Sequence, residues 1–176
     1  MTTLVYTPLS FDDLHIRLLT LHPGEYNDRI RISLHKVRLL SAIGQRDESV
    51  QSQVQSPLQA NNYIPSYEAL SYAWGPSENA RTITKTSASS DALISVTENL
   101  DTALRHLRYT KAGRLLWIDA ICIDQENVAE RSCQVSFMGT IYALATRVAV
   151  WLGPKDGDSS YAMDLVESLG QKLAVD

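Results

Sequence analysis

Two polar segments of this 176-residue chain carry the side chains best suited to chemistry. Carboxylates can stabilise a developing positive charge or hold ligand hydroxyls, and aromatic rings can stack on a flat heterocycle. Each segment follows an apolar stretch, so we expect both to lie at the carboxyl ends of strands, where ligands of open α/β sheets collect. The candidate site residues are Ser71, Tyr72, Trp74, Gly75, Asp119, Asp124, Gln125, Glu130 and Arg131.

Asp119 interrupts the otherwise apolar run from Leu115 to Ile123, which we expect to form a buried strand. An unpaired carboxylate in such surroundings is costly to bury, so Asp119 needs an explanation. In a structural interpretation it accepts backbone N–H bonds or pairs with an arginine such as Arg131. In a functional interpretation it lies at the mouth of a polar cleft and holds ligand hydroxyls. Both interpretations stay open.

Glu130 also has two interpretations. Asn127-x-x-Glu130 has the form of a capping box, in which the glutamate side chain reaches back to the N–H of the capping residue. Catalysis is the other role, and one carboxylate at a helix start can serve both. Asp124 is interpreted as a cap or turn residue rather than a catalyst.

The aromatic and sulfur side chains divide in the same way. Trp117 is predicted to be a core residue, whereas Trp74 sits beside a Gly-Pro turn and fits either a core or a stacking role. Cys122 lies in an apolar run with no histidine nearby in sequence, so we expect a buried, weakly nucleophilic thiol. A disulfide between Cys122 and Cys133 is not favoured.

Several common chemistries are excluded by the absence of their motifs. The sequence has no G-x-G-x-x-G, no P-loop and no G-x-S-x-G elbow. Its four histidines are scattered and do not have zinc-ligand spacing. We therefore expect no resident cofactor and no metal.

Charge and hydropathy exclude further classes. The net charge is −4 with no long basic run, which argues against nucleic acid and against docking on anionic membranes. No apolar run approaches the roughly 20 residues that span a bilayer, and no signal peptide is evident. We expect a single cytoplasmic domain over residues 1–176.

The amino-terminal half is predicted to be mostly strands. Antiparallel strands are expected over 14–21 and 30–39, followed by a flexible Gln/Ser-rich loop over 41–62. A strand rich in aromatics follows over 67–74, and a small polar hairpin over 81–96.

The carboxy-terminal half alternates between helix and strand. Helical spacing begins at Leu100, again near Asn127 and again near Ala162, with apolar strands over 115–123 and 148–152. This order predicts the α/β class with a parallel sheet flanked by helices. The amino-terminal strands are expected to add antiparallel pieces at the edge or top of that sheet.

Several long motifs occur in an order that resembles the fungal heterokaryon incompatibility (HET) domain over roughly residues 14–170. The motifs are Ile16–Leu19, Pro23-Gly24, Tyr67–Gly75, Leu116–Gln125, Glu130-Arg131, Gln134-Val135, Met138, Ile141-Tyr142 and Val150–Gly153.

The resemblance implies a module of nonself recognition in filamentous fungi that triggers programmed cell death when incompatible cells fuse. It also implies distant kinship with the TIR domain and hence a TIR/flavodoxin-like parallel sheet. HET proteins often carry more chain after this domain, so the sequence is expected to be part of a longer protein.

Some TIR domains cleave NAD at the bond to nicotinamide, using a glutamate near the strand ends. This chain departs from that pattern, because the matching region, 155–167, offers Asp156, Asp158 and Glu167 but no matching motif. Glu130 therefore does not correspond to the TIR glutamate by order along the chain.

Two functional hypotheses follow. In the first, the chain hydrolyses NAD as a substrate, with Glu130 or Asp119 stabilising the ribose cation, Tyr72 or Trp74 stacking on a ring, and Arg131 near the phosphates. In the second, it is a non-catalytic signalling module that acts by homotypic oligomerisation when a protein partner brings domains together.

Overall fold

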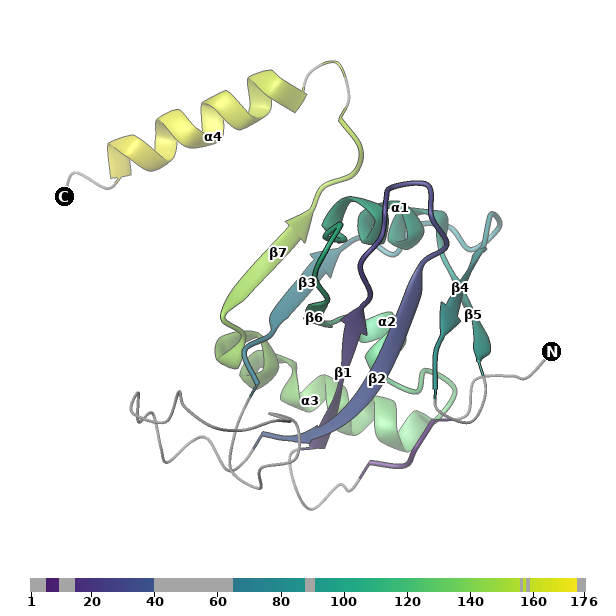
Figure 1. Cartoon of the computed structure of the whole chain (residues 1–176). Helices are drawn as coiled ribbons and strands as arrows, with labels where there is room; N and C mark the ends of the chain where they lie inside the picture. The colour runs from purple at the N-terminus through teal and green to yellow at the C-terminus, as the bar shows by residue number, and fades with distance from the viewer. Residues whose placement is uncertain are drawn as a thin grey trace.

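The computed structural model describes residues 6–9, 15–39, 65–87, 91–155, 157 and 159–173, so the loop expected over 41–62 lies outside the described residues. The elements, shown in Figure 1, are β1 (His15–Leu21), β2 (Arg31–Arg38), β3 (Glu68–Tyr72), β4 (Arg81–Lys85), β5 (Ala92–Val96), α1 (Glu98–Leu107), β6 (Arg114–Trp117), α2 (Asp119–Cys122), α3 (Val128–Leu144), β7 (Arg147–Trp151) and α4 (Ser159–Leu173).

The described strands form one sheet in the order β5-β4-β2-β1-β6-β3-β7. β3 is parallel to both β6 and β7, as expected for the carboxy-terminal half, and β1 is antiparallel to β2 and to β6. The expected α/β class is confirmed, with a sheet that is parallel at one side and mixed across its width.

The amino-terminal strands β1 and β2 add antiparallel pieces at the β6 edge of the parallel strands β6-β3-β7, so that prediction is confirmed. β1 sits between β2 and β6 near the middle (Figure 1). The physical reason is its side chains, since Ile16, Leu18, Leu19 and Leu21 are fully buried although they point to both faces. A strand that is apolar on both faces must be covered on both faces, which a central position in the sheet favours.

The expected strand over 115–123 is wrong in its second half. β6 ends at Trp117, and Asp119–Cys122 form the short helix α2, which packs against β1. A continuous apolar run does not distinguish a buried strand from a buried helical turn, so periodicity could not show this break. Asp119 therefore stands at the start of a helix, just past a strand end, and not inside a strand.

The predicted helix starts are confirmed by their caps. The Thr97 hydroxyl accepts the N–H of Leu100 at the start of α1, and the Asn127 side chain accepts the N–H of Glu130 at the start of α3. The small hairpin is confirmed as the antiparallel pair β4 and β5.

The core is formed by both faces of the sheet with α1, α2 and α3. Trp117 is fully buried, as predicted, and meets the ring of Tyr142 edge-on at 5.5 Å between centroids. Two tyrosine hydroxyls join α3 to the sheet: Tyr142 donates to the carbonyl of Leu70, and Tyr67 donates to that of Ile141. α3 is thereby fixed against β3 and β6, the strands whose ends carry the candidate site.

β7 and α4 form the least covered part of the described chain. β7 is hydrogen-bonded to β3 on one side only among the described strands, and α4 extends away from the sheet (Figure 1). Exposed apolar side chains run along both elements: Val148, Val150, Leu152, Met163, Leu165 and Val166. No helix in the described ranges is long and apolar enough to cross a membrane.

Candidate functional site

The centre of the site is a contact between two strand ends. Trp74, just after β3, donates its indole N–H to Asp119 Oδ2 at 3.0 Å, and Asp119 Oδ1 accepts the N–H of Ala120 at 2.7 Å. The chain turns after Trp74 at Gly75, whose φ of +73° is in the left-handed region that favours glycine. Trp74 is 45% exposed, and Asp119 is half-buried. An accessible ring and a fixed carboxylate thus lie side by side.

Asn99 joins the first turn of α1 to this edge of the sheet. Its Nδ2 donates to the carbonyl of Ala73 at 2.6 Å, and its Oδ1 accepts the indole N–H of Trp151 at 2.9 Å. Trp151 in turn packs on the His106 ring at 5.0 Å between centroids. Sequence reasoning missed Asn99, Trp151 and His106 as site residues, and Trp151 entered it only as part of a family motif.

The segment after α2 folds back over Asp119. The Gln125 side chain donates to the backbone carbonyl of Asp119 at 2.9 Å, and Arg131 donates to the carbonyl of Gln125 at 2.9 Å. The proposed pairing of Asp119 with Arg131 is therefore not formed, whereas a backbone N–H bond to Asp119 is present. Arg131 remains exposed beside the site.

Electrostatics set Asp119 apart from an ordinary surface carboxylate. Burial raises the pKa of Asp119 above its usual range, and the bonds from Trp74 and Ala120 offset part of that rise. Tyr72, at the end of β3, has its pKa raised chiefly by burial and further by the charge of Asp119. Its phenol is therefore neutral and close to the carboxylate. Ser71 is half-buried and pairs in register with Val150 of β7.

Glu130 lies in a separate, buried cluster. Its two carboxylate oxygens accept from the Arg17 guanidinium at 2.5 and 2.9 Å, and Oε1 also accepts the N–H of Asp124 at 2.8 Å. Arg17 and Glu130 are only 3% and 2% exposed. Arg17 also donates to the carbonyl of Cys122. Sequence reasoning missed Arg17, which nothing in its strand pattern distinguishes.

This arrangement answers the capping question for Glu130. The Asn127 side chain caps α3, but the Glu130 carboxylate turns to Arg17 and Asp124 instead of returning to the N–H of Asn127, which bonds to the carbonyl of Asp124. Only half of the predicted capping box is formed. Burial alone would raise the pKa of Glu130, but the bonds from Arg17 and Asp124 bring it below its ordinary value.

Both segments of the site lie in the part of the chain that a protein-family model matches. The family model for Heterokaryon incompatibility protein (HET) matches residues 67–175, which include both segments of the site. The chain belongs to the HET family. It is similar to "Heterokaryon incompatibility protein 6, OR allele" of Neurospora crassa, with 37% identity over 175 residues. That alignment covers 94% of this chain but 22% of the relative, so the chain spans about a fifth of the length of that protein.

No solved structure matches this HET chain. The HET assignment thus agrees with the resemblance drawn from the motifs, while the TIR kinship stays a prediction.

Two further places in the HET chain carry side chains capable of nucleophilic chemistry. His22 Nε2 lies 2.7 Å from the Ser33 hydroxyl, the Ser33 and Thr86 hydroxyls lie 3.1 Å apart, and Thr86 donates to the carbonyl of Ile32. Cys122 is fully buried, as predicted, and burial raises its pKa to about 12. Among the described residues, no group of three or more His, Cys, Asp or Glu could hold a metal ion.

Proposed function

We propose that this HET-family chain acts in the cytoplasm in heterokaryon incompatibility, where it triggers programmed cell death by hydrolysing NAD at the nicotinamide–ribose bond. The name of its Neurospora crassa relative supports the biological role. The observation that carries the chemical part is the Trp74–Asp119 contact, a half-buried carboxylate fixed beside an accessible aromatic ring at the carboxyl ends of β3 and β6.

The reaction needs few groups. The bond between the ribose C1′ and the nicotinamide nitrogen breaks, its electron pair leaves with nicotinamide, and positive charge develops on the ribose. Asp119 stabilises this charge, water adds at C1′, and a proton is released to solvent, giving nicotinamide and ADP-ribose. NAD is consumed as a substrate and is not a resident cofactor.

The remaining site residues bind and position. The exposed face of Trp74 stacks on a ring of NAD, while its N–H holds Asp119 in place. Tyr72 supplies a neutral phenol near the carboxylate, and Arg131, exposed beside Gln125, faces the phosphates. Glu130 contributes indirectly, because its ion pair with Arg17 and its bond from Asp124 fix the segment that covers Asp119.

The direct test incubates the purified chain, or the full-length protein in an assembled state, with NAD and measures nicotinamide by chromatography. We expect release by the unaltered protein and its loss in Asp119→Asn. The matched control is Asp91→Asn, an exposed aspartate outside the site, which should keep full activity. Absence of release by assembled protein under conditions that kill cells, or equal activity of both variants, would contradict the catalytic proposal.

A second candidate function is a non-catalytic signalling module that acts through homotypic contacts after a partner brings domains together. The exposed apolar side chains along β7 and α4 favour it, because a monomer gains nothing from leaving them in water. Here a folded Asp119→Asn protein would stay lethal in fungal cells, whereas Val150→Lys would reduce both self-association, measured by light scattering, and cell death. If Asp119→Asn abolishes cell death and Val150→Lys leaves it unchanged, the result supports the NAD-hydrolysing enzyme instead.

A further inference from the structure

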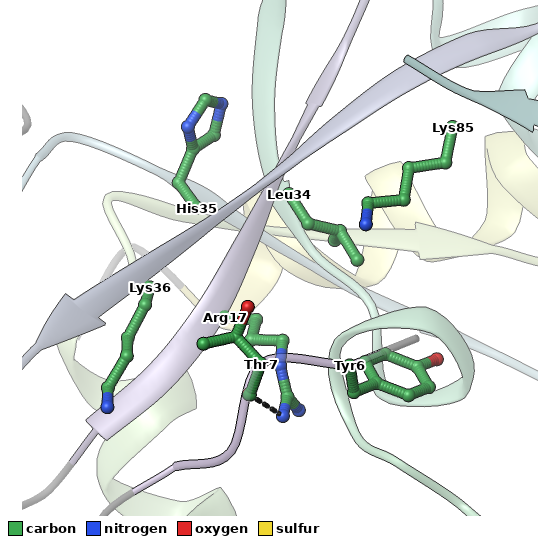
Figure 2. Close-up of a pocket in the computed structure, with 7 residues that line it drawn as sticks. All are labelled: Tyr6, Thr7, Arg17, Leu34, His35, Lys36 and Lys85. Atoms are coloured by element: carbon green, nitrogen blue, oxygen red, sulfur yellow. Dashed lines mark hydrogen bonds between the residues drawn. The ribbon is translucent and has the colours of Figure 1, made fainter. Parts of the chain in front are cut away.

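A small pocket lies beside the buried Arg17. Its volume is about 60 Å³, and it is enclosed by the amino-terminal segment 6–9 and by side chains of β1, β2 and β4 (Figure 2). Such a volume admits a few water molecules or one small oxyanion. None of the residues lining it is acidic. They are Tyr6, Thr7, Arg17, Leu34, His35, Lys36 and Lys85.

Arg17 supplies a buried donor to this pocket. Its two terminal nitrogens bond Glu130, Cys122 and the carbonyl of Thr7, which fixes the guanidinium under the ring of Tyr6. Its Nε has no hydrogen-bond partner in the described part of the chain, although the side chain is 3% exposed. A buried N–H without an acceptor is unfavourable, so the position is completed by a group that accepts a hydrogen bond.

Lys85 supplies a second cation at the same place. It ends β4 and is half-buried, and its ammonium group makes no hydrogen bond or ion pair with any described residue. In Figure 2 its ammonium points toward Leu34, between β4 and the amino-terminal segment. Lys36, by contrast, donates to the carbonyl of Pro8, and His35 points to the opposite side of β2.

The net charge of the side chains that line the pocket favours an anion as its ligand. Glu130 neutralises Arg17, whereas Lys85 and Lys36 have no carboxylate partner among the residues of the structure. The excess is positive in a half-enclosed space with Leu34 and the Tyr6 ring as apolar walls. This combination of a planar guanidinium edge and a lysine ammonium suits the oxygens of a phosphate group.

We propose that this pocket binds a phosphate group between Arg17 Nε and Lys85 Nζ. The group is either free inorganic phosphate or the terminal phosphate of a small molecule, and the apolar walls exclude bulk water from its far side. The site is distinct from the Trp74–Asp119 contact and does not depend on NAD hydrolysis.

The test titrates the chain with inorganic phosphate at constant ionic strength, with chloride as the reference anion, and follows the Nε–H signal of Arg17 by ¹⁵N NMR. We expect a saturable shift with phosphate and none with chloride. Lys85→Gln should weaken phosphate binding by about tenfold or more, as loss of one charged hydrogen bond implies. The control Lys111→Gln, an exposed lysine in the loop before β6, should leave the affinity unchanged.

A second variant separates the pocket from general surface charge. Leu34→Trp keeps every cation but fills the space, and it should abolish the phosphate-induced shift while circular dichroism remains that of the folded chain. Adenosine monophosphate is titrated in parallel: saturable binding of both ligands supports a terminal-phosphate site, and binding of inorganic phosphate alone supports a free-ion site. No shift with either ligand, or equal weakening by Lys85→Gln and Lys111→Gln, overturns the proposal.

Discussion

Two carboxylates lie close to α2 in very different surroundings. Glu130 is buried, accepts three hydrogen bonds, and is neutralised by Arg17. Asp119 is half-buried, accepts one indole and one backbone N–H, and has no cationic partner among the described residues. The pKa of Glu130 is lowered, whereas that of Asp119 is raised.

The difference indicates that Glu130 is suited to a structural role in the HET fold and Asp119 to a chemical one. A carboxylate whose charge is already neutralised by a fixed guanidinium attracts a cationic ligand only weakly. One whose ionised form is under-stabilised gains from a nearby positive charge, such as a ribose cation. Four predictions test this contrast.

The largest expected effect is on stability. Glu130→Gln leaves Arg17 buried without a counter-charge, so the free energy of unfolding should fall by about 3–5 kcal/mol. Urea denaturation measures the change. The control is Glu98→Gln, which removes an exposed ion pair with Arg81 and should cost much less. Equal losses in the two variants would contradict the contrast.

The second effect is on activity. Asp119→Asn keeps the size of the side chain but removes the charge and one of its two accepting oxygens, so nicotinamide release should fall by about 10²- to 10³-fold. Its unfolding free energy should change by less than about 1 kcal/mol, because the group is half-exposed and unpaired. A variant that loses stability but keeps activity would reverse the roles assigned to the two carboxylates.

The third effect is the pH dependence of stability. The folded pKa of Glu130 is depressed, so its contribution is complete above its ordinary value of 4.5 and is lost as the pH falls through the lower folded value. The folded pKa of Asp119 is raised, so its contribution is present in acid and is lost as the pH rises from 3.8 through the higher folded value. Denaturation curves recorded across this pH range give the unfolding free energy at each pH. The slope of that free energy against pH should change in opposite directions in Glu130→Gln and Asp119→Asn.

The smallest effect concerns the indole bond. Trp74→Phe keeps an aromatic ring but removes the donor to Asp119, so the pKa of Asp119 should rise further, at a cost in stability of about 1 kcal/mol. A carbon-13 NMR titration of the Asp119 carboxyl group measures the shift. Trp151→Phe, which removes the bond to Asn99 instead, should leave that pKa unchanged.

The sequence was sufficient for features that local patterns determine. The caps at Thr97 and Asn127 depend on neighbouring residues, and the order of helices and strands follows from periodicity. Both segments of the site were placed at strand ends because polar residues after apolar runs have few other locations. The motifs that suggested the HET family lie in these same segments.

The remainder required contacts between distant residues. Arg17 and Glu130 are separated by 113 positions, so no local pattern connects them. The break between β6 and α2 was hidden because Ile118, Ile121 and Cys122 are buried either way. The central position of β1 depends on which strand it pairs with, and that choice is made by tertiary packing.

The exposure of Trp74 has a practical consequence. Indole emission responds to the polarity and charge around the ring, and Trp74 has its N–H bound to a carboxylate while its ring remains open to solvent. Trp117 is fully buried, and Trp151 is half-buried beside His106, so neither indole ring is as accessible to a ligand as that of Trp74. The molecule thus carries an intrinsic fluorophore at the centre of its candidate site, by which occupancy of that site can be followed without a label.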